Sequence, residues 1–204
     1  IYRKKFILPK GIENKRIFID FGGVMTAAKV YLNGTYIGEN KGGYNDFSFE
    51  LTKFVNWKGE NVLAVEVDST ERKDIPPFGN LIDYLTFGGI YRDVQLRIVK
   101  NVFIENVFAK PFDVLSDNRK LNVKAFLNNQ QNGLTLSAEL FEGNKVIAKK
   151  SSHSSELTFE SLQNIELWNI DNPKLYKLVV TLYDDSQILD QYETRIGFRE
   201  AKFT

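Results

Sequence analysis

Apolar and polar residues alternate with a period of two through most of this chain, a pattern that predicts β-strands rather than helices. In the first half it predicts strands over residues 16–21, 28–32, 35–38, 47–51, 61–67 and 93–99. Asn33 and Gly34 join two of these strands. Asn-Gly is the preferred pair of a type I′ hairpin, in which both central residues take positive φ. Short strands joined by such turns predict a sandwich or a barrel.

The alternation resumes at Val102 and continues to the end of the chain. It predicts further strands over residues 121–128, 134–142, 146–150, 156–162, 175–183 and 188–197. About seven short strands in roughly 100 residues are typical of an immunoglobulin-like sandwich. We expect Trp168 to fill one end of its core. The predicted fold class is therefore all-β, with one domain over residues 1–100 and a second over residues 101–204.

Between residues 69 and 89 the alternation stops. An irregular stretch of about 20 residues is unusual inside a compact domain and is commonly functional or interface-forming. This one contains several large apolar side chains, among them Phe78, Tyr84 and Phe87. Such a stretch is too apolar to remain free in water, so we expect it to fold against another surface.

Composition narrows the classes of function. The net charge is only +1, from 27 basic and 26 acidic residues, and no dense basic face indicates nucleic-acid binding. No apolar run reaches the length of a membrane span. The chain has no cysteine, which excludes disulfides and thiolate metal sites and favours a cytoplasmic over a secreted location.

The sequence offers little for catalysis by this chain itself. His153 is the only histidine and lies between serines in a predicted solvated turn. Without a second histidine or a cysteine it does not predict a metal site, and no cofactor is expected. Asp184 and Asp185 are adjacent carboxylates, and Asp93 follows Arg92. None has a reason to be buried and so to have a raised pKa, and we expect no catalytic residue here.

Several motifs, in their order and spacing, resemble those of glycoside hydrolase family 2. They are DFGGV at residues 20–24, AKVYLNG at 28–34, GGY at 42–44, ELT at 50–52, LWNIDNPKLY at 167–176 and GFR at 197–199. The resemblance implies a galactose-binding-like jelly-roll sandwich followed by an immunoglobulin-like β-sandwich. In that family the catalytic glutamates belong to a later (β/α)8 barrel, whose motifs do not occur in this sequence.

The run IDYLTFGGIYRDV at residues 82–94 resembles the β-galactosidase branch of that family. The resemblance implies that Asp83 binds substrate at the sugar subsite. Alternatively, Asp83 caps a turn in a surface loop. Tyr84 and Phe87 could stack on a sugar face or fill a contact with the barrel.

Four residues of the same run are expected to be structural or to form an interface, as is Trp168. Gly88 and Gly89 allow backbone angles that other residues avoid. Alternation places Arg92 and Asp93 on opposite faces of a strand, and we expect Arg92 to pair with a neighbouring acid or with the barrel.

The leading hypothesis is that this chain is the non-catalytic N-terminal region of a retaining, β-galactosidase-like enzyme. Its expected partners are its own C-terminal barrel, a β-galactoside in the intact enzyme, and other subunits of a homo-oligomer; nucleic acid and membrane are not expected. The alternatives are a glucuronidase- or mannosidase-type relative, a stand-alone carbohydrate-binding module, and a purely adhesive pair of β-domains.

Overall fold

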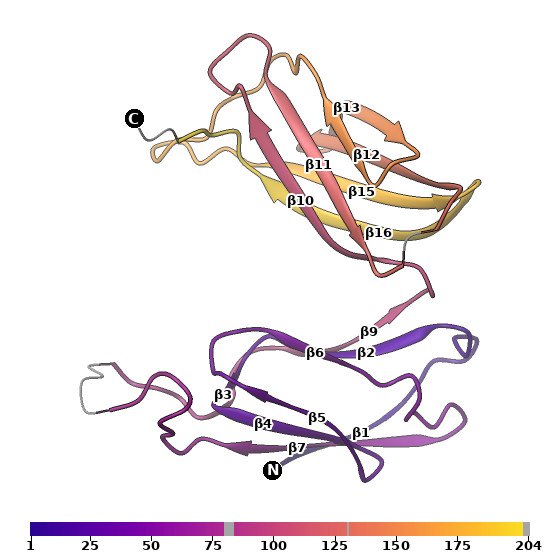
Figure 1. Cartoon of the computed structure of the whole chain (residues 1–204), viewed down its shortest axis with the longest axis vertical. Helices are drawn as coiled ribbons and strands as arrows, with labels where there is room; N and C mark the ends of the chain where they lie inside the picture. The colour runs from indigo at the N-terminus through magenta and orange to yellow at the C-terminus, as the bar shows by residue number, and fades with distance from the viewer. Residues whose placement is uncertain (80–83, 130, 202–204) are drawn as a thin grey trace. The chain divides into compact units, whose positions relative to one another are not determined.

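The computed structural model describes residues 1–79, 84–129 and 131–201. These residues form β-strands and no helix, which confirms the all-β class. The described chain therefore contains no helix that could cross a membrane. It divides into two compact units, Ile1–Asn101 and Val102–Thr204, and each is described by itself (Figure 1).

Unit 1 is a sandwich of two antiparallel sheets closed at one end by a short strand pair. The larger sheet has the order β1 (Tyr2–Ile7), β7 (Glu60–Asp68), β4 (Ala27–Leu32) and β5 (Thr35–Lys41). The smaller sheet has the order β6 (Phe47–Glu50), β2 (Arg16–Phe21) and β9 (Val94–Val99). The closing pair is β3 (Val24–Met25) with β8 (Gly89–Ile90).

The core of unit 1 follows from the alternation in its strands. On β2, Ile17, Ile19 and Phe21 are buried, and the residues between them face outward. Burying one such side chain contributes about 1.5–3 kcal/mol. The predicted hairpin is confirmed, because Asn33 and Gly34 have φ values of 52° and 83°.

Unit 2 is a second antiparallel sandwich. One sheet has the order β10 (Ile104–Phe112), β11 (Lys120–Leu127) and β14 (Glu156–Phe159). The other has the order β13 (Lys145–Ser152), β12 (Leu134–Glu142), β15 (Tyr176–Asp184) and β16 (Gln187–Ile196). Inward side chains of both sheets form one apolar core. These seven strands agree with the immunoglobulin-like sandwich that the sequence predicts.

The structure corrects the prediction for Trp168. Its indole is only partly buried and lies against Gly197, outside the core. Arg199 covers the ring, with 4.6 Å from the guanidinium carbon to the ring centroid. The core is filled instead by Phe198, which is 0% exposed, and Tyr176, whose rings meet edge to face at 5.5 Å. Because Gly197 has no side chain, the Trp168 indole packs directly on the backbone of residue 197, at the edge of the core.

We therefore expect Phe198→Ala to destabilise unit 2 much more than Trp168→Ala. Removing a fully buried aromatic ring leaves a cavity and costs about 3–5 kcal/mol, whereas Trp168 is only partly buried and loses contacts outside the core. Urea unfolding followed by circular dichroism gives both values without relying on tryptophan fluorescence. Equal losses of unfolding free energy in the two variants would contradict this assignment of the core.

Candidate functional site

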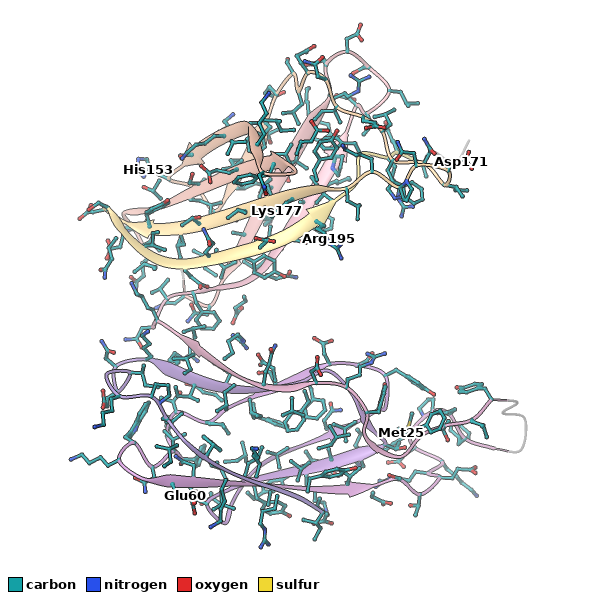
Figure 2. The ribbon with its side chains drawn as sticks, turned by 180° about the vertical axis from the view of Figure 1, so that it is seen from behind. Met25, Glu60, His153, Asp171, Lys177 and Arg195 are labelled. Carbon is teal, nitrogen blue, oxygen red and sulfur yellow. The ribbon has the colours of Figure 1, made fainter. Side chains whose placement is uncertain are left out.

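The candidate site lies at the end of unit 1 where the β3–β8 pair, the turn at residues 42–44 and the irregular segment after β7 meet. Figure 2 labels Met25 at this end of the unit. Asp83, the predicted sugar ligand, lies outside the described residues. The site is therefore described from the residues that surround it.

Hydrogen bonds join these segments into one base. The Ser69 hydroxyl donates to the Met25 carbonyl at 2.9 Å. The Thr26 N–H donates to the Asp68 carbonyl at 3.2 Å, and the Gly42 N–H donates to the Thr26 carbonyl at 2.9 Å. Residues 24–26 thus fix both the start of the irregular segment and the neighbouring turn.

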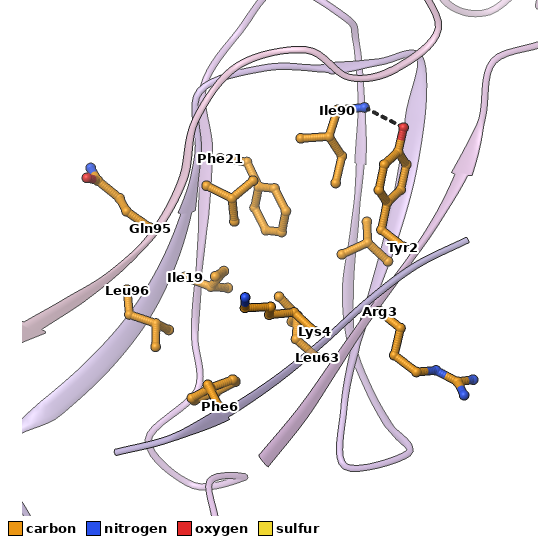
Figure 3. A pocket seen from close by; sticks show the side chains of 12 residues that line it. Tyr2, Arg3, Lys4, Phe6, Ile19, Phe21, Leu63, Ile90, Gln95 and Leu96 are labelled. Carbon is orange, nitrogen blue, oxygen red and sulfur yellow. Dashed lines mark hydrogen bonds between the residues drawn. The ribbon is translucent and has the colours of Figure 1, made fainter. Parts of the chain in front are cut away.

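Gly88 and Gly89 have steric reasons to be glycine. A Cβ on Gly88 would stand 2.6 Å from the Ser69 side chain. Gly89 has a φ of 100°, which L side chains rarely adopt, and a Cβ there would collide with the Tyr2 hydroxyl. That hydroxyl accepts a hydrogen bond from the Ile90 N–H at 3.3 Å (Figure 3). The two glycines allow β8 to lie close to both the loop and β1.

Arg92 connects the segments on the other side of this base. Its guanidinium donates to the carbonyls of Gly22 at 3.1 Å and Tyr44 at 3.3 Å, and lies over the ring of Tyr91 at 5.2 Å. The Tyr91 hydroxyl in turn donates to the Gly43 carbonyl at 2.6 Å. Within the described part of the chain Arg92 binds carbonyls, where the sequence predicts a neighbouring acid or the barrel.

Asp93 acts through its backbone in the same region. Its carbonyl accepts the N–H of Gly22 at 2.9 Å, and its side chain is exposed. Because β9 begins only at Val94, Arg92 and Asp93 precede the strand and do not occupy its two faces. The prediction of a strand beginning at residue 93 was wrong by one residue.

Large apolar side chains project from this base into solvent. Phe87 is 72% exposed, Leu85 84%, and Phe78 and Tyr84 about half. The Tyr84 and Tyr44 hydroxyls lie 3.4 Å apart, and this hydrogen bond raises the pKa of Tyr44. Among the large aliphatic residues of the segment that the structure describes, only Ile75 is buried. We call Tyr44, Phe78, Tyr84, Leu85 and Phe87 the aromatic rim.

The acidic side chains of the described loop form their hydrogen bonds within the loop. Arg72 donates two hydrogen bonds of 3.0 Å to Asp74, which lower the pKa of that carboxyl to about 2. The hydroxyl and N–H of Thr70 lower the pKa of Asp68. Both carboxylates stay ionised at neutral pH, whereas a general acid needs a raised pKa. Neither Asp68 nor Asp74 is therefore suited to act as a general acid.

His153 is exposed in unit 2, with its Nδ1 3.2 Å from the Thr135 hydroxyl. Over the described ranges, no group of three or more His, Asp or Glu side chains could hold a metal ion. Tyr44 and Tyr91 were not predicted from the sequence to be site residues. The GGY motif at residues 42–44 was the signal that could have located the first.

Comparison with known proteins gives the same family for both units. The model of "Glycosyl hydrolases family 2, sugar binding domain" matches residues 1–99, and that of "Glycosyl hydrolases family 2" matches residues 102–199. A β-galactosidase of Thermoanaerobacterium thermosulfurigenes is 39% identical over 99% of this chain. A β-glucuronidase of Formosa agariphila is 29% identical over 99% of it.

Solved structures of a β-galactosidase and a β-glucuronidase also resemble this chain. A putative β-galactosidase from Bacteroides fragilis superposes with a TM-score of 0.84 at 29% identity over 98% of this chain and 33% of its own. A Bacteroides uniformis β-glucuronidase superposes with a TM-score of 0.82 at 28% identity over 96% of this chain and 26% of its own. The chain spans 30% of the length of the T. thermosulfurigenes relative and 23% of that of the F. agariphila relative.

Gly89→Ala should destabilise unit 1 by roughly 1–3 kcal/mol, because alanine is strained at this positive φ and its methyl group meets the Tyr2 hydroxyl. Tyr2→Phe removes that hydroxyl, so the same substitution should cost less in the Tyr2→Phe background. A double-mutant cycle by urea unfolding separates the two contributions. An equal cost in both backgrounds would show that Tyr2 does not restrict this position.

The Asp74 carboxyl should titrate with a midpoint near 2, followed by NMR of its side-chain carbon. Because its folded pKa lies below the ordinary value of 3.8, the Arg72–Asp74 pair stabilises the loop above that value. This stabilisation is lost as the pH falls through about 2. Arg72→Leu should return the midpoint towards 3.8. A midpoint of 3.8 in the unaltered chain would mean that the pair does not form.

Proposed function

Because this chain belongs to glycosyl hydrolases family 2, we propose that it is the N-terminal, non-catalytic part of a β-galactosidase-like enzyme. In this proposal the two sandwiches support a catalytic barrel elsewhere in the same polypeptide. The segment at residues 69–89 carries Asp83 to the edge of the sugar subsite. The length of the relatives, of which this chain spans less than a third, supports a larger parent enzyme.

The observation that carries the proposal is the aromatic rim on its anchored base. Phe87 and Leu85 are mostly exposed, although the backbone on either side of the rim is fixed by hydrogen bonds to Met25 and Tyr44. Contiguous apolar side chains on a surface mark an interaction site. A barrel that covers the rim would bury these side chains and bring the adjoining Asp83 next to bound sugar.

The separate roles that we propose for the barrel and for this chain follow from the chemistry of retaining glycosidases. They need two carboxyl groups about 5–5.5 Å apart, one as nucleophile and one as acid/base; we assign both to the barrel. Asp83 would act as an acceptor for sugar hydroxyls. Charge-assisted hydrogen bonds of this kind contribute about 1.5–3 kcal/mol. Where they strengthen in the transition state they raise turnover as well as affinity.

A β-galactoside is the substrate we favour over a β-glucuronide. The run at residues 82–94 resembles the galactosidase branch, and the T. thermosulfurigenes β-galactosidase shares more identity with this chain than the F. agariphila β-glucuronidase does. A neutral sugar also needs no cation in its subsite. This fits the use of Arg92 to bind backbone carbonyls.

Asp83→Ala in the full-length enzyme should lower kcat/KM for an aryl β-galactoside by roughly 10- to 100-fold, the loss of one charge-assisted hydrogen bond. Asp46→Ala is the matched control, because Asp46 is an exposed carboxylate two residues from Tyr44. It should leave kcat/KM unchanged. Thermal unfolding of both variants tests that the fold is intact.

Unchanged kinetics in folded Asp83→Ala enzyme would remove Asp83 from the subsite. The 204-residue chain alone separates the proposal from a self-sufficient binding module. An NMR titration with galactose should give no saturable shifts, because the subsite needs the barrel. Saturable shifts at Tyr84 and its neighbours would favour the binding module.

A further inference from the structure

The dipeptide Asn-Gly occurs twice in the sequence, at residues 33–34 and 132–133. Asparagine is a chemically labile residue, and it is most reactive before glycine, because no side chain hinders the glycine nitrogen that attacks its amide. The two copies look alike from the sequence and the backbone. Each lies in a turn with its asparagine exposed, and the glycine φ is 83° at Gly34 and 89° at Gly133. Exposure and glycine conformation therefore do not distinguish them.

The amide of Asn33 is fixed by three hydrogen bonds. Its Nδ2 donates to the Phe54 carbonyl at 3.0 Å and to the Asn61 Oδ1 at 2.9 Å. Its Oδ1 accepts the Val62 N–H at 2.9 Å. Asn61 is itself 0% exposed, so this partner is part of the folded interior. Nδ2 cannot leave until both of its bonds break, and the amide cannot turn towards Gly34 without losing the third.

The amide of Asn132 has no such partners. Its side chain forms no hydrogen bond with any residue that the structure describes. It lines a cavity of about 420 Å³ in unit 2, together with Gln131, His153 and two serines (Figure 2 labels His153). This space admits water and lets the amide rotate. A Cβ built on Gly133 would meet nothing within 4 Å, so this glycine is not packed against another segment.

We propose that Asn132 is a site of spontaneous deamidation in the folded chain, and that the fold protects Asn33 from the same reaction. The Gly133 nitrogen, after losing its proton to hydroxide, forms a bond to the Asn132 Cγ. The Cγ–Nδ2 bond breaks, Nδ2 takes a proton from water and leaves as ammonia, and a cyclic succinimide remains. Water then hydrolyses one of the two imide bonds. Hydrolysis at Cγ gives aspartate, and hydrolysis at the backbone carbonyl gives isoaspartate.

The isoaspartate product changes the backbone beside the core of unit 2. Its main chain runs through the former side chain and is longer by one methylene group. The strand β12 begins at Leu134, directly after Gly133, and Leu134 is buried and pairs with Asp184. A longer main chain at residue 132 therefore displaces the start of β12. The aspartate product adds only a charge on an exposed side chain.

The first experiment compares the two sites in one sample. The folded 204-residue chain is incubated at mildly alkaline pH in water enriched in ¹⁸O, and both Asn-Gly peptides are followed by mass spectrometry after proteolysis in ordinary water. The label enters only by hydrolysis of succinimide formed during the incubation. Asn132 should react roughly 100-fold faster than Asn33, because each of the three hydrogen bonds of the Asn33 amide lowers its reactive population about fivefold.

Two controls accompany this comparison. In the chain unfolded by urea both sites lose their contacts, and their rates should become similar. Asn132→Gln should remove the reaction at residue 132 in the folded chain, because the longer side chain must close a larger and less favourable ring. It should leave the rate at Asn33 unchanged.

The second experiment separates the effect of the backbone from that of the charge. Asn132→Asp carries the same charge as the isoaspartate form on an unaltered main chain. The isoaspartate form, purified by ion exchange, should melt below Asn132→Asp by roughly 4–8 °C, the shift that a fivefold change in the unfolding equilibrium gives for a domain of about 100 residues. Asn132→Asp should melt with the unaltered chain.

Four outcomes would overturn the proposal. Equal rates at the two sites in the folded chain would show that the hydrogen bonds of Asn33 do not protect it. A folded chain without label at Asn132, beside an unfolded chain that reacts, would show that the turn prevents ring closure. A difference that persists in urea would assign the cause to neighbouring sequence. An isoaspartate form as stable as Asn132→Asp would exclude the effect on β12. None of these results bears on Asp83 or on the barrel.

Discussion

Both units depend on the burial of alternate side chains between two facing sheets. The chain contains no cysteine, so no disulfide links the sheets. Each strand must therefore place its apolar residues on one face, as Ile17, Ile19 and Phe21 do on β2. A shift of one residue in any strand would turn this set outward. The register of the sheets follows from this constraint.

At one end of unit 1 the constraint is met by the shortest strands. The β3–β8 pair is two residues long, and it joins the loop after β7 to the turn before β6 through Met25 and Gly89. The aromatic rim stands on this pair. Its side chains are exposed, and hydrogen bonds from Ser69 to Met25 and from Arg92 to Tyr44 fix the segments on either side of it.

Unit 2 shows how packing decides between two similar side chains. Trp168 and Phe198 are both aromatic and both lie in motifs of the family, but only Phe198 enters the core. The tryptophan packs on Gly197 and under Arg199. Its motif is no less specific for this, because a Cβ at residue 197 would crowd the indole at 3.0–3.2 Å. The role of a motif residue therefore depends on what lies across from it.

The amino-acid sequence by itself determined the all-β class, most strand positions and the hairpin at Asn33 and Gly34, because burial on one face imposes a period of two and positive φ selects Asn-Gly. The predicted strand over residues 134–142 has the bounds of β12. Its motifs also indicated the family. Tertiary structure alone decided the rest. Strands of two residues are too short to alternate, so β3 and β8 were not predicted. The partners of Arg92 and the position of Trp168 outside the core depend on segments distant in sequence, and no local pattern identifies those segments.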